Sequence, residues 1–231
     1  MSDLSFWCRK GVFNLVSVFV ILFIYTNTYS QTIGKSKNVI WYTPSEVQKI
    51  NGIAIGPFES AILGKQQIVN GLTFSIVGMG IFFTIAEEHN RLDRFFYNFP
   101  KSAGEIEYEK LLNKRLVEQD SLIRIMKISY THNGLVISGA GAMSDKVNGI
   151  CIGGLANYFQ EVNGLIVSGI VNNAWILRGV SIACINESYY FKGIQIGIYN
   201  RTIRQRGIQI GIWNRNLRRS FPLINWGFRQ N

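Results

Sequence analysis

The feature that most constrains the fold is a tandem repeat near the C-terminus. The octet G-I-Q-I-G-I-Y-N begins at Gly193, and G-I-Q-I-G-I-W-N begins fourteen residues later at Gly207. An internal repeat this short restricts the chain to architectures in which similar units pack side by side. Weaker copies of the unit begin at Gly52, Gly71, Gly134, Gly149, Gly164 and Gly179.

Within each copy, counted from its Gly as position 1, the residues alternate with the period of a β-strand. From Gly134 onward, positions 2 and 4 are Ile, Leu or Val and position 5 is Ser, Gly or Ala, whereas position 3 ranges from Val136 to Gln209. This pattern predicts one apolar face and one tolerant face. We expect the Ile side chains to stack inside the protein and the Asn residues that end most repeats to form a ladder at one corner. These residues are Asn157, Asn172, Asn186, Asn200 and Asn214.

Three architectures fit a repeat of fourteen or fifteen residues. The first is a parallel β-solenoid whose coils each hold one regular strand and a shorter, variable return segment. The second is an outer-membrane antiparallel β-barrel with one strand per repeat, and the third is a soluble sheet of hairpins joined by Asn-Gly turns. The repeats all begin with Gly and most end with Asn, which suits coils that run in one direction. The sequence therefore favours an all-β solenoid, with the barrel as the alternative.

The repeats are interrupted and bounded by segments of different character. Residues 31–85 hold an N-terminal segment and the first repeats. Residues 86–127 contain most of the acidic residues and no repeat, and apolar residues recur there at helical spacing, so we expect a helical insertion. Residues 128–231 form the regular repeat region, which ends in an irregular unit containing Pro222. Such a unit is typical of a C-terminal cap.

Residues 1–30 have the composition of a secretory signal peptide. Arg9 and Lys10 precede an apolar run from Val12 to Tyr25, and small residues at Thr28 and Ser30 suit cleavage before Gln31. The length of this run is typical of a signal and short for a membrane span. We expect export to the outer membrane, cell surface or periplasm, and an uncleaved anchor is the alternative. Cys151 and Cys184 would then remain, which we interpret as buried apolar thiols.

The sequence has no motif of a nucleophile elbow, a phosphate-binding loop or a zinc protease. Its two histidines, His89 and His132, have no cysteine or carboxylate partners at the spacing of a metal site. A polysaccharide-active enzyme would need two carboxylates facing one groove. The few acids of the repeat region are too widely separated for this, so we expect no enzyme, cofactor or metal. They are Asp145, Glu161 and Glu187.

The C-terminal repeats are strongly basic, within a chain of formal net charge +10. Arg201 and Arg215 hold equivalent repeat positions, as do Arg204 and Arg218, so a solenoid would stack them into a positive ridge on the return segment. This ridge would attract lipopolysaccharide phosphates, acidic glycans or an anionic membrane surface. Alternatively, the charges only keep this face soluble and prevent edge pairing. The candidate residues are Arg201, Arg204, Arg206, Arg215, Arg218 and Arg219.

The two best repeats resemble the Gly-Leu-Gln-Ile-Gly-Leu-x-Asn units of bacterial surface-repeat proteins of leptospires and Bacteroidota. The closing P-L-I-N-W-G-F is similar to the ends of such proteins, and the likeness covers about Gly179–Phe228. This resemblance implies an exported, envelope-associated protein without catalytic residues. We therefore expect a structural or interaction module of the envelope, which binds other envelope proteins through its insertion and no nucleic acid. A small outer-membrane pore or anchor is the alternative.

Overall fold

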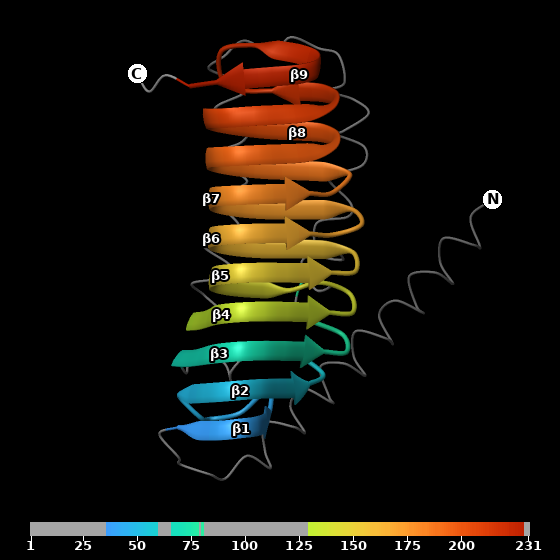
Figure 1. Ribbon diagram of the computed structural model, residues 1–231. Helices are drawn as coiled ribbons and strands as arrows, with labels where there is room; N and C mark the ends of the chain where they lie inside the picture. The colour runs from blue at the N-terminus through green and yellow to red at the C-terminus, as the bar shows by residue number, and fades with distance from the viewer. Residues whose placement is uncertain (1–35, 60–65, 79, 81–128, 229–231) are drawn as a thin grey trace, which may run out of the picture.

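The computed structural model describes residues 36–59, 66–78, 80 and 129–228. The predicted signal peptide at 1–30 and the predicted helical insertion at 86–127 lie outside these residues. The described chain is almost entirely strand (Figure 1). Its strands are β1 (Lys37–Tyr42), β2 (Lys49–Gly56), β3 (Gln66–Ser75), β4 (Ser129–Ser138), β5 (Met143–Gly153), β6 (Ala156–Val167), β7 (Val171–Ile182), β8 (Ile185–Arg215) and β9 (Ser220–Gly227).

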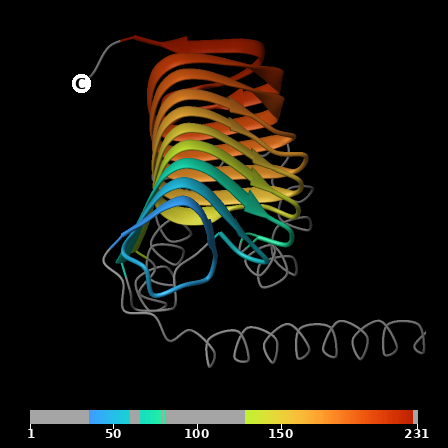
Figure 2. The ribbon, with the colours of Figure 1, turned by 60° about the horizontal axis from the view of Figure 1, so that its bottom comes forward.

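The strands form a β-solenoid, as the repeats predict. Each strand from β1 to β7 pairs in parallel with the next along the chain, which an antiparallel barrel or a set of hairpins does not allow. The register aligns the first Gly of every repeat, including Gly71 with Gly134 across the interruption. Figure 2, turned so that the N-terminal end comes forward, shows the coils stacked in line behind β1. The return segment is also strand, since β7 alone covers twelve residues of a coil.

The first Gly of each repeat forms a corner at which successive coils approach closely. Gly149 has a φ of +137°, and a β-carbon on it would lie 2.1 Å from the carbonyl oxygen of Gly134 in the preceding coil. Only glycine fits both this backbone conformation and this spacing. Val39 holds the equivalent place in β1, where no described coil precedes it. The Gly repeat is therefore a requirement of coil stacking.

The two faces of the strand are reversed relative to our expectation. The position-3 side chains point inward and are buried, whereas the Ile residues at positions 2 and 4 point outward, with Ile150 and Ile196 42% and 39% exposed. The expected internal Ile stack is therefore wrong. A period of two shows which residues share a face but not which face is enclosed. The buried position-3 residues are Val136, Cys151, Ile166, Ser181, Gln195 and Gln209.

The interior changes from apolar to polar along the stack. Val136, Cys151 and Ile166 pack with buried residues such as Phe159 and Leu177 in the middle coils. In the C-terminal coils the same position carries amides: Gln209 donates to Gln195 over 2.8 Å, and Asn225 donates to Gln209 over 3.0 Å. Buried amides are tolerated because each finds a partner in a neighbouring coil.

The buried asparagines form the predicted ladder. Asn186 donates to Asn200 over 2.8 Å, and Asn200 donates to Asn214 over the same distance. Each of these donors also bonds a backbone carbonyl of the next coil, as Asn200 does to Ile210 over 2.9 Å. The ladder explains the small residue at position 5, because a β-carbon on Gly197 would lie 2.7 Å from the amide nitrogen of Asn186.

The last repeat ends the stack as a hairpin, which fits the irregular cap expected there. The side chain of Asn216 accepts hydrogen bonds from the backbone N–H groups of Arg218 and Arg219 and holds the turn. β9 then runs back antiparallel to the end of β8. Asn225 on β9 continues the internal amide column, so the cap matches the polar interior of the coils beneath it.

Candidate interaction surface

The outward side chains at positions 2 and 4 form two continuous apolar columns, which we call the apolar face. None of them is buried. Position 2 contributes Ile40, Ile53, Leu72, Leu135, Ile150, Leu165, Val180, Ile194 and Ile208, and position 4 contributes Tyr42, Ile55, Phe74, Ile137, Ile152, Val167, Ile182, Ile196 and Ile210.

The apolar face is comparable in area to the largest apolar patch on a typical monomeric protein. Seven parallel pairings and one further step inside β8, at about 4.8 Å each, make it about 40 Å long. Two columns two residues apart make it about 10 Å wide, or roughly 400 Å². The largest apolar patch on a typical monomer covers about 300–600 Å² and is often functional.

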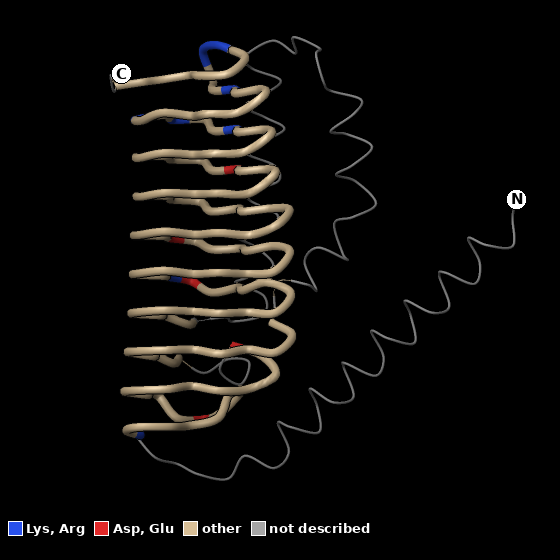
Figure 3. The backbone as a smooth tube through the Cα atoms, turned by 45° about the vertical axis from the view of Figure 1, so that its right-hand side comes forward, with Lys and Arg blue, Asp and Glu red and all other residues tan. Residues whose placement is uncertain are grey.

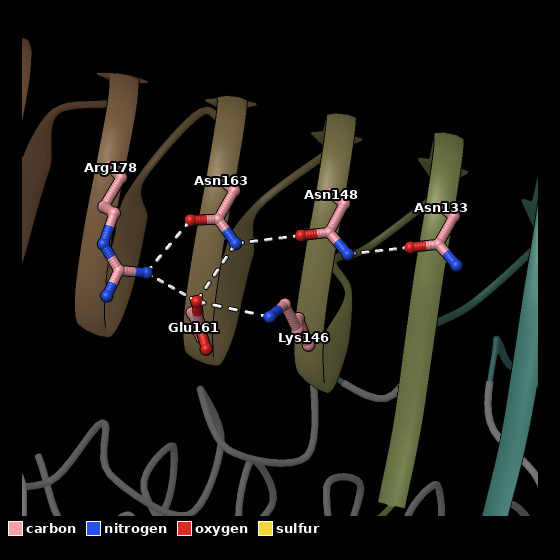
Figure 4. Close-up of polar contacts among 6 residues, drawn as sticks. All are labelled: Asn133, Lys146, Asn148, Glu161, Asn163 and Arg178. Atoms are coloured by element: carbon pink, nitrogen blue, oxygen red, sulfur yellow. Dashed lines mark hydrogen bonds and ion pairs between the residues drawn. The ribbon is translucent and has the colours of Figure 1, made fainter.

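A second ladder of asparagines follows one edge of the apolar face, at the residue before each corner Gly (Figure 4). Asn148 donates to Asn133 over 2.7 Å, and Asn163 donates to Asn148 over 2.8 Å. The ladder starts at Asn38, and all its bonds run in the same direction, so the side-chain dipoles add. Its final oxygen, on Asn163, accepts a bond from Arg178.

Glu161 forms an ion pair with Arg178, the cation at the end of this ladder. Its carboxylate lies 2.5 Å from Arg178 and 3.3 Å from Lys146, and it also accepts from Asn163. Partial burial raises the pKa of Glu161, but these hydrogen bonds and the charge of Lys146 outweigh it and leave the pKa below its usual value. Arg178 is therefore bound within the protein at neutral pH.

Beyond Arg178, the same edge carries exposed cations. Lys192 and Arg206 take the place of the asparagines in the next two coils, directly before Gly193 and Gly207. Both are exposed, and no ion pair joins either to another residue of the described chain. Figure 3 shows Lys and Arg gathered toward the C-terminal coils and the closing hairpin. The sequence signal was present, since the residue before Gly is basic in three consecutive repeats, but our sequence analysis did not treat these residues as a column.

The six predicted arginines do not form one ridge. The side chain of Arg201 is only 12% exposed and lies 2.8 Å from the carboxylate of Glu187. Arg219 stacks on Trp226 at 4.7 Å and donates to Asn225 and to the carbonyl of Trp226. These two side chains therefore serve contacts within the protein.

The remaining arginines are divided between the coils and the cap. Arg204 is exposed, with its guanidinium 5.5 Å from the ring of Tyr189, and Arg206 follows it on the same side of the strand. Arg215 is half-buried at the end of β8. Arg218 lies in the hairpin turn, so the expectation that it stacks on Arg204 in a further coil is wrong, because the chain reverses at Asn216.

Ionisable groups inside the middle coils are closed off from solvent. Glu59, Tyr130, His132 and Cys151 are each no more than 1% exposed. Burial lowers the pKa of His132 to about 3. Burial, and secondarily the charge of Glu59, raises the pKa values of Tyr130 and Cys151. A substrate has no access to these groups in the folded chain, so they are part of the core.

The two cysteines differ in a way that our sequence analysis did not foresee. Cys151 is buried, as expected, but Cys184 is exposed. The interpretation of Cys184 as a buried thiol is therefore wrong. In the part of the chain that the structure describes, no three His, Cys, Asp or Glu residues group closely enough to hold a metal ion. The same part of the chain holds no helix with the length and apolar character needed to cross a membrane.

Comparison of the chain with protein-family models, with curated proteins and with solved structures gives no match.

Proposed function

We propose that the protein is an exported envelope or surface module with a structural or interaction role, and that the apolar face is its interaction surface. The observation that carries this proposal is the reversal of the strand faces. Aliphatic side chains point to solvent, while Gln195, Gln209 and the Asn ladder fill the interior.

Such an arrangement leaves apolar side chains exposed that a partner could cover. Covering roughly 400 Å² of apolar surface contributes about 10 kcal/mol before the entropy of association is subtracted. The stacked coils also hold the face rigid, because glycine corners and amide ladders fix each coil on the next. A rigid apolar surface loses little conformational entropy when a partner covers it.

We also propose that the protein binds an anionic partner. Fewer of the six candidate arginines are available for this contact than the sequence suggested. Arg201 and Arg219 are engaged by Glu187 and by Trp226, and Arg215 is half-buried. The exposed side chains of Arg204, Arg206 and Arg218, with Lys192, are better placed to meet an anionic envelope component. We propose no enzymatic role. We also do not propose a membrane pore, because that alternative depended on an antiparallel β-barrel.

The test is fractionation of cells that express the chain with residues 1–30 in place. We expect the protein in the envelope fraction, and we expect the double variant Ile152→Lys with Ile196→Lys to detach from it. The control is Ile170→Lys, which adds a charge to an exposed isoleucine in the turn between β6 and β7, outside both columns. Circular dichroism must show that the variants retain their fold. Wild-type protein that stays in the cytosol, or an apolar-face variant that stays attached, would contradict the proposal.

A further inference from the structure

The structure also indicates what covers the apolar face, given the proposed function. We propose that this face docks on an anionic lipid surface, with its aliphatic columns at the level of the headgroups and upper acyl chains. Lys192, Arg204 and Arg206, which we call the cationic border, would contact the lipid phosphates. The inference rests on the placement of these charges relative to the aliphatic columns.

Apolar and cationic groups are adjacent in the same coils. Lys192 is separated from Ile194 only by the corner Gly193, and Arg206 is separated from Ile208 only by Gly207. Arg204 lies two residues before Arg206 and is also exposed, so it projects on the same side of the strand. A protein surface held at a lipid interface combines these two elements, namely buried apolar area and cations near anionic headgroups.

The rest of the edge also suits headgroups. In the coils before Arg178 it carries the Asn ladder, whose amides are uncharged. The described coils from β7 onward contain one acidic side chain, Glu187, which is buried beside Arg201 and does not reach the border. Glu161, the acidic side chain beside the Asn ladder, is neutralised by Arg178 and Lys146, so an anionic surface would meet little like charge along this edge.

A second copy of the chain fits the face less well. Two faces of roughly 400 Å² would bury about 800 Å² in total, below the roughly 1,200–2,000 Å² of a stable specific interface. The border would also find no available carboxylate on the facing copy, because Glu161, the acidic side chain beside the Asn ladder, is held by Arg178 and Lys146. A lipid surface does not have to be complementary in shape to the protein. The attraction between the protein and an anionic lipid surface grows with each cation that reaches the headgroups.

The test uses the exported chain and vesicles of phosphatidylcholine with or without phosphatidylglycerol. We expect sedimentation with the anionic vesicles, weakened by salt. The variant Lys192→Gln with Arg206→Gln should bind them about 25-fold more weakly, at about fivefold for each lost charge. The control, Lys37→Gln, removes a charge that lies over the Trp41 ring in β1, outside the border, and should bind within about twofold of wild type.

A second variant tests the apolar contribution. Ile196→Ser with Ile210→Ser should weaken binding to anionic vesicles, while Ile170→Ser in the turn between β6 and β7 should not. Equal binding of the border variant and the wild type would overturn the inference. So would failure to bind vesicles together with a dimer in analytical ultracentrifugation that Ile196→Ser dissociates, since the occupant would then be a second copy. A dimer would not contradict attachment of the protein to the envelope in cells. The lipid-docking inference can therefore be wrong while the proposed function holds.

Discussion

The carbonyl oxygen of Gly164 lies 1.9 Å from the point that a β-carbon on Gly179 would occupy. Gly179 also has a φ of +140°, which side chains of L-residues rarely adopt. The relationship recurs at the corner of each coil, so the spacing of the stack and the Gly repeat have the same cause.

Gly179→Ala should therefore destabilise the protein strongly. The strained φ and the contact with Gly164 together should cost at least about 2 kcal/mol of unfolding free energy, measured by denaturant unfolding. Gly227→Ala is the control, because a β-carbon there would lie 3.0 Å from its nearest neighbour and meets no positive φ. It should cost less than about 1 kcal/mol. Equal losses for the two variants would show that the corners are not in close contact.

The two asparagine ladders should differ in their contribution to stability. Asn200→Ala removes the ladder acceptor of Asn186 and leaves the carbonyl of Ile210 and the side-chain oxygen of Asn214 without the amide that donates to them, and should cost about 2–4 kcal/mol. Asn148→Ala removes a rung of the half-exposed edge ladder, where water can replace the lost bonds, and should cost about 1 kcal/mol or less. Thermal unfolding of both variants measures this difference. A larger loss for Asn148→Ala would mean that the buried ladder is misassigned.

Stability should fall as the solution is acidified below the usual pKa of histidine. Burial lowers the pKa of His132 from 6.5 to about 3. At a pH between these two values, His132 is protonated in the unfolded chain but neutral in the folded chain. The contribution of His132 is complete above pH 6.5 and is lost as the pH falls toward 3, at up to about 1.4 kcal/mol per pH unit. Urea unfolding between pH 7 and 5 should show this slope. His132→Phe should flatten it, and an unchanged slope would indicate that the imidazole titrates normally.

Releasing Arg178 should extend the cationic border. Glu161→Gln removes the carboxylate that holds Arg178 and Lys146, so two more cations become available at the same edge. Binding to phosphatidylglycerol vesicles should strengthen by about fivefold or more. The unfolding free energy should change by no more than about 1 kcal/mol, because these ion pairs are partly exposed. Weaker vesicle binding by Glu161→Gln would contradict the assignment of this edge.

The repeats predicted the solenoid, its register and the buried Asn ladder, because each depends on residues recurring at a fixed spacing. They did not predict which face is enclosed. The alternation places Gln195 and Gln209 on the tolerant face because position 3 varies. An isolated buried amide is costly, but stacked coils allow each amide to bond the next. The arginine ridge failed for a local reason, because Asn216 turns the chain before a further coil can form.

The most direct test of the central claim compares the thiol reactivity of two neighbouring residues. In a Cys184→Ser background, which removes the exposed native thiol, Ile196→Cys and Gln195→Cys are each treated with a water-soluble maleimide under native conditions. Reversed faces predict that the thiol at 196 reacts at the rate of an exposed cysteine, while the thiol at 195 reacts only after denaturation. Fast reaction at 195 with protection at 196 would place the Ile columns inside and contradict the account.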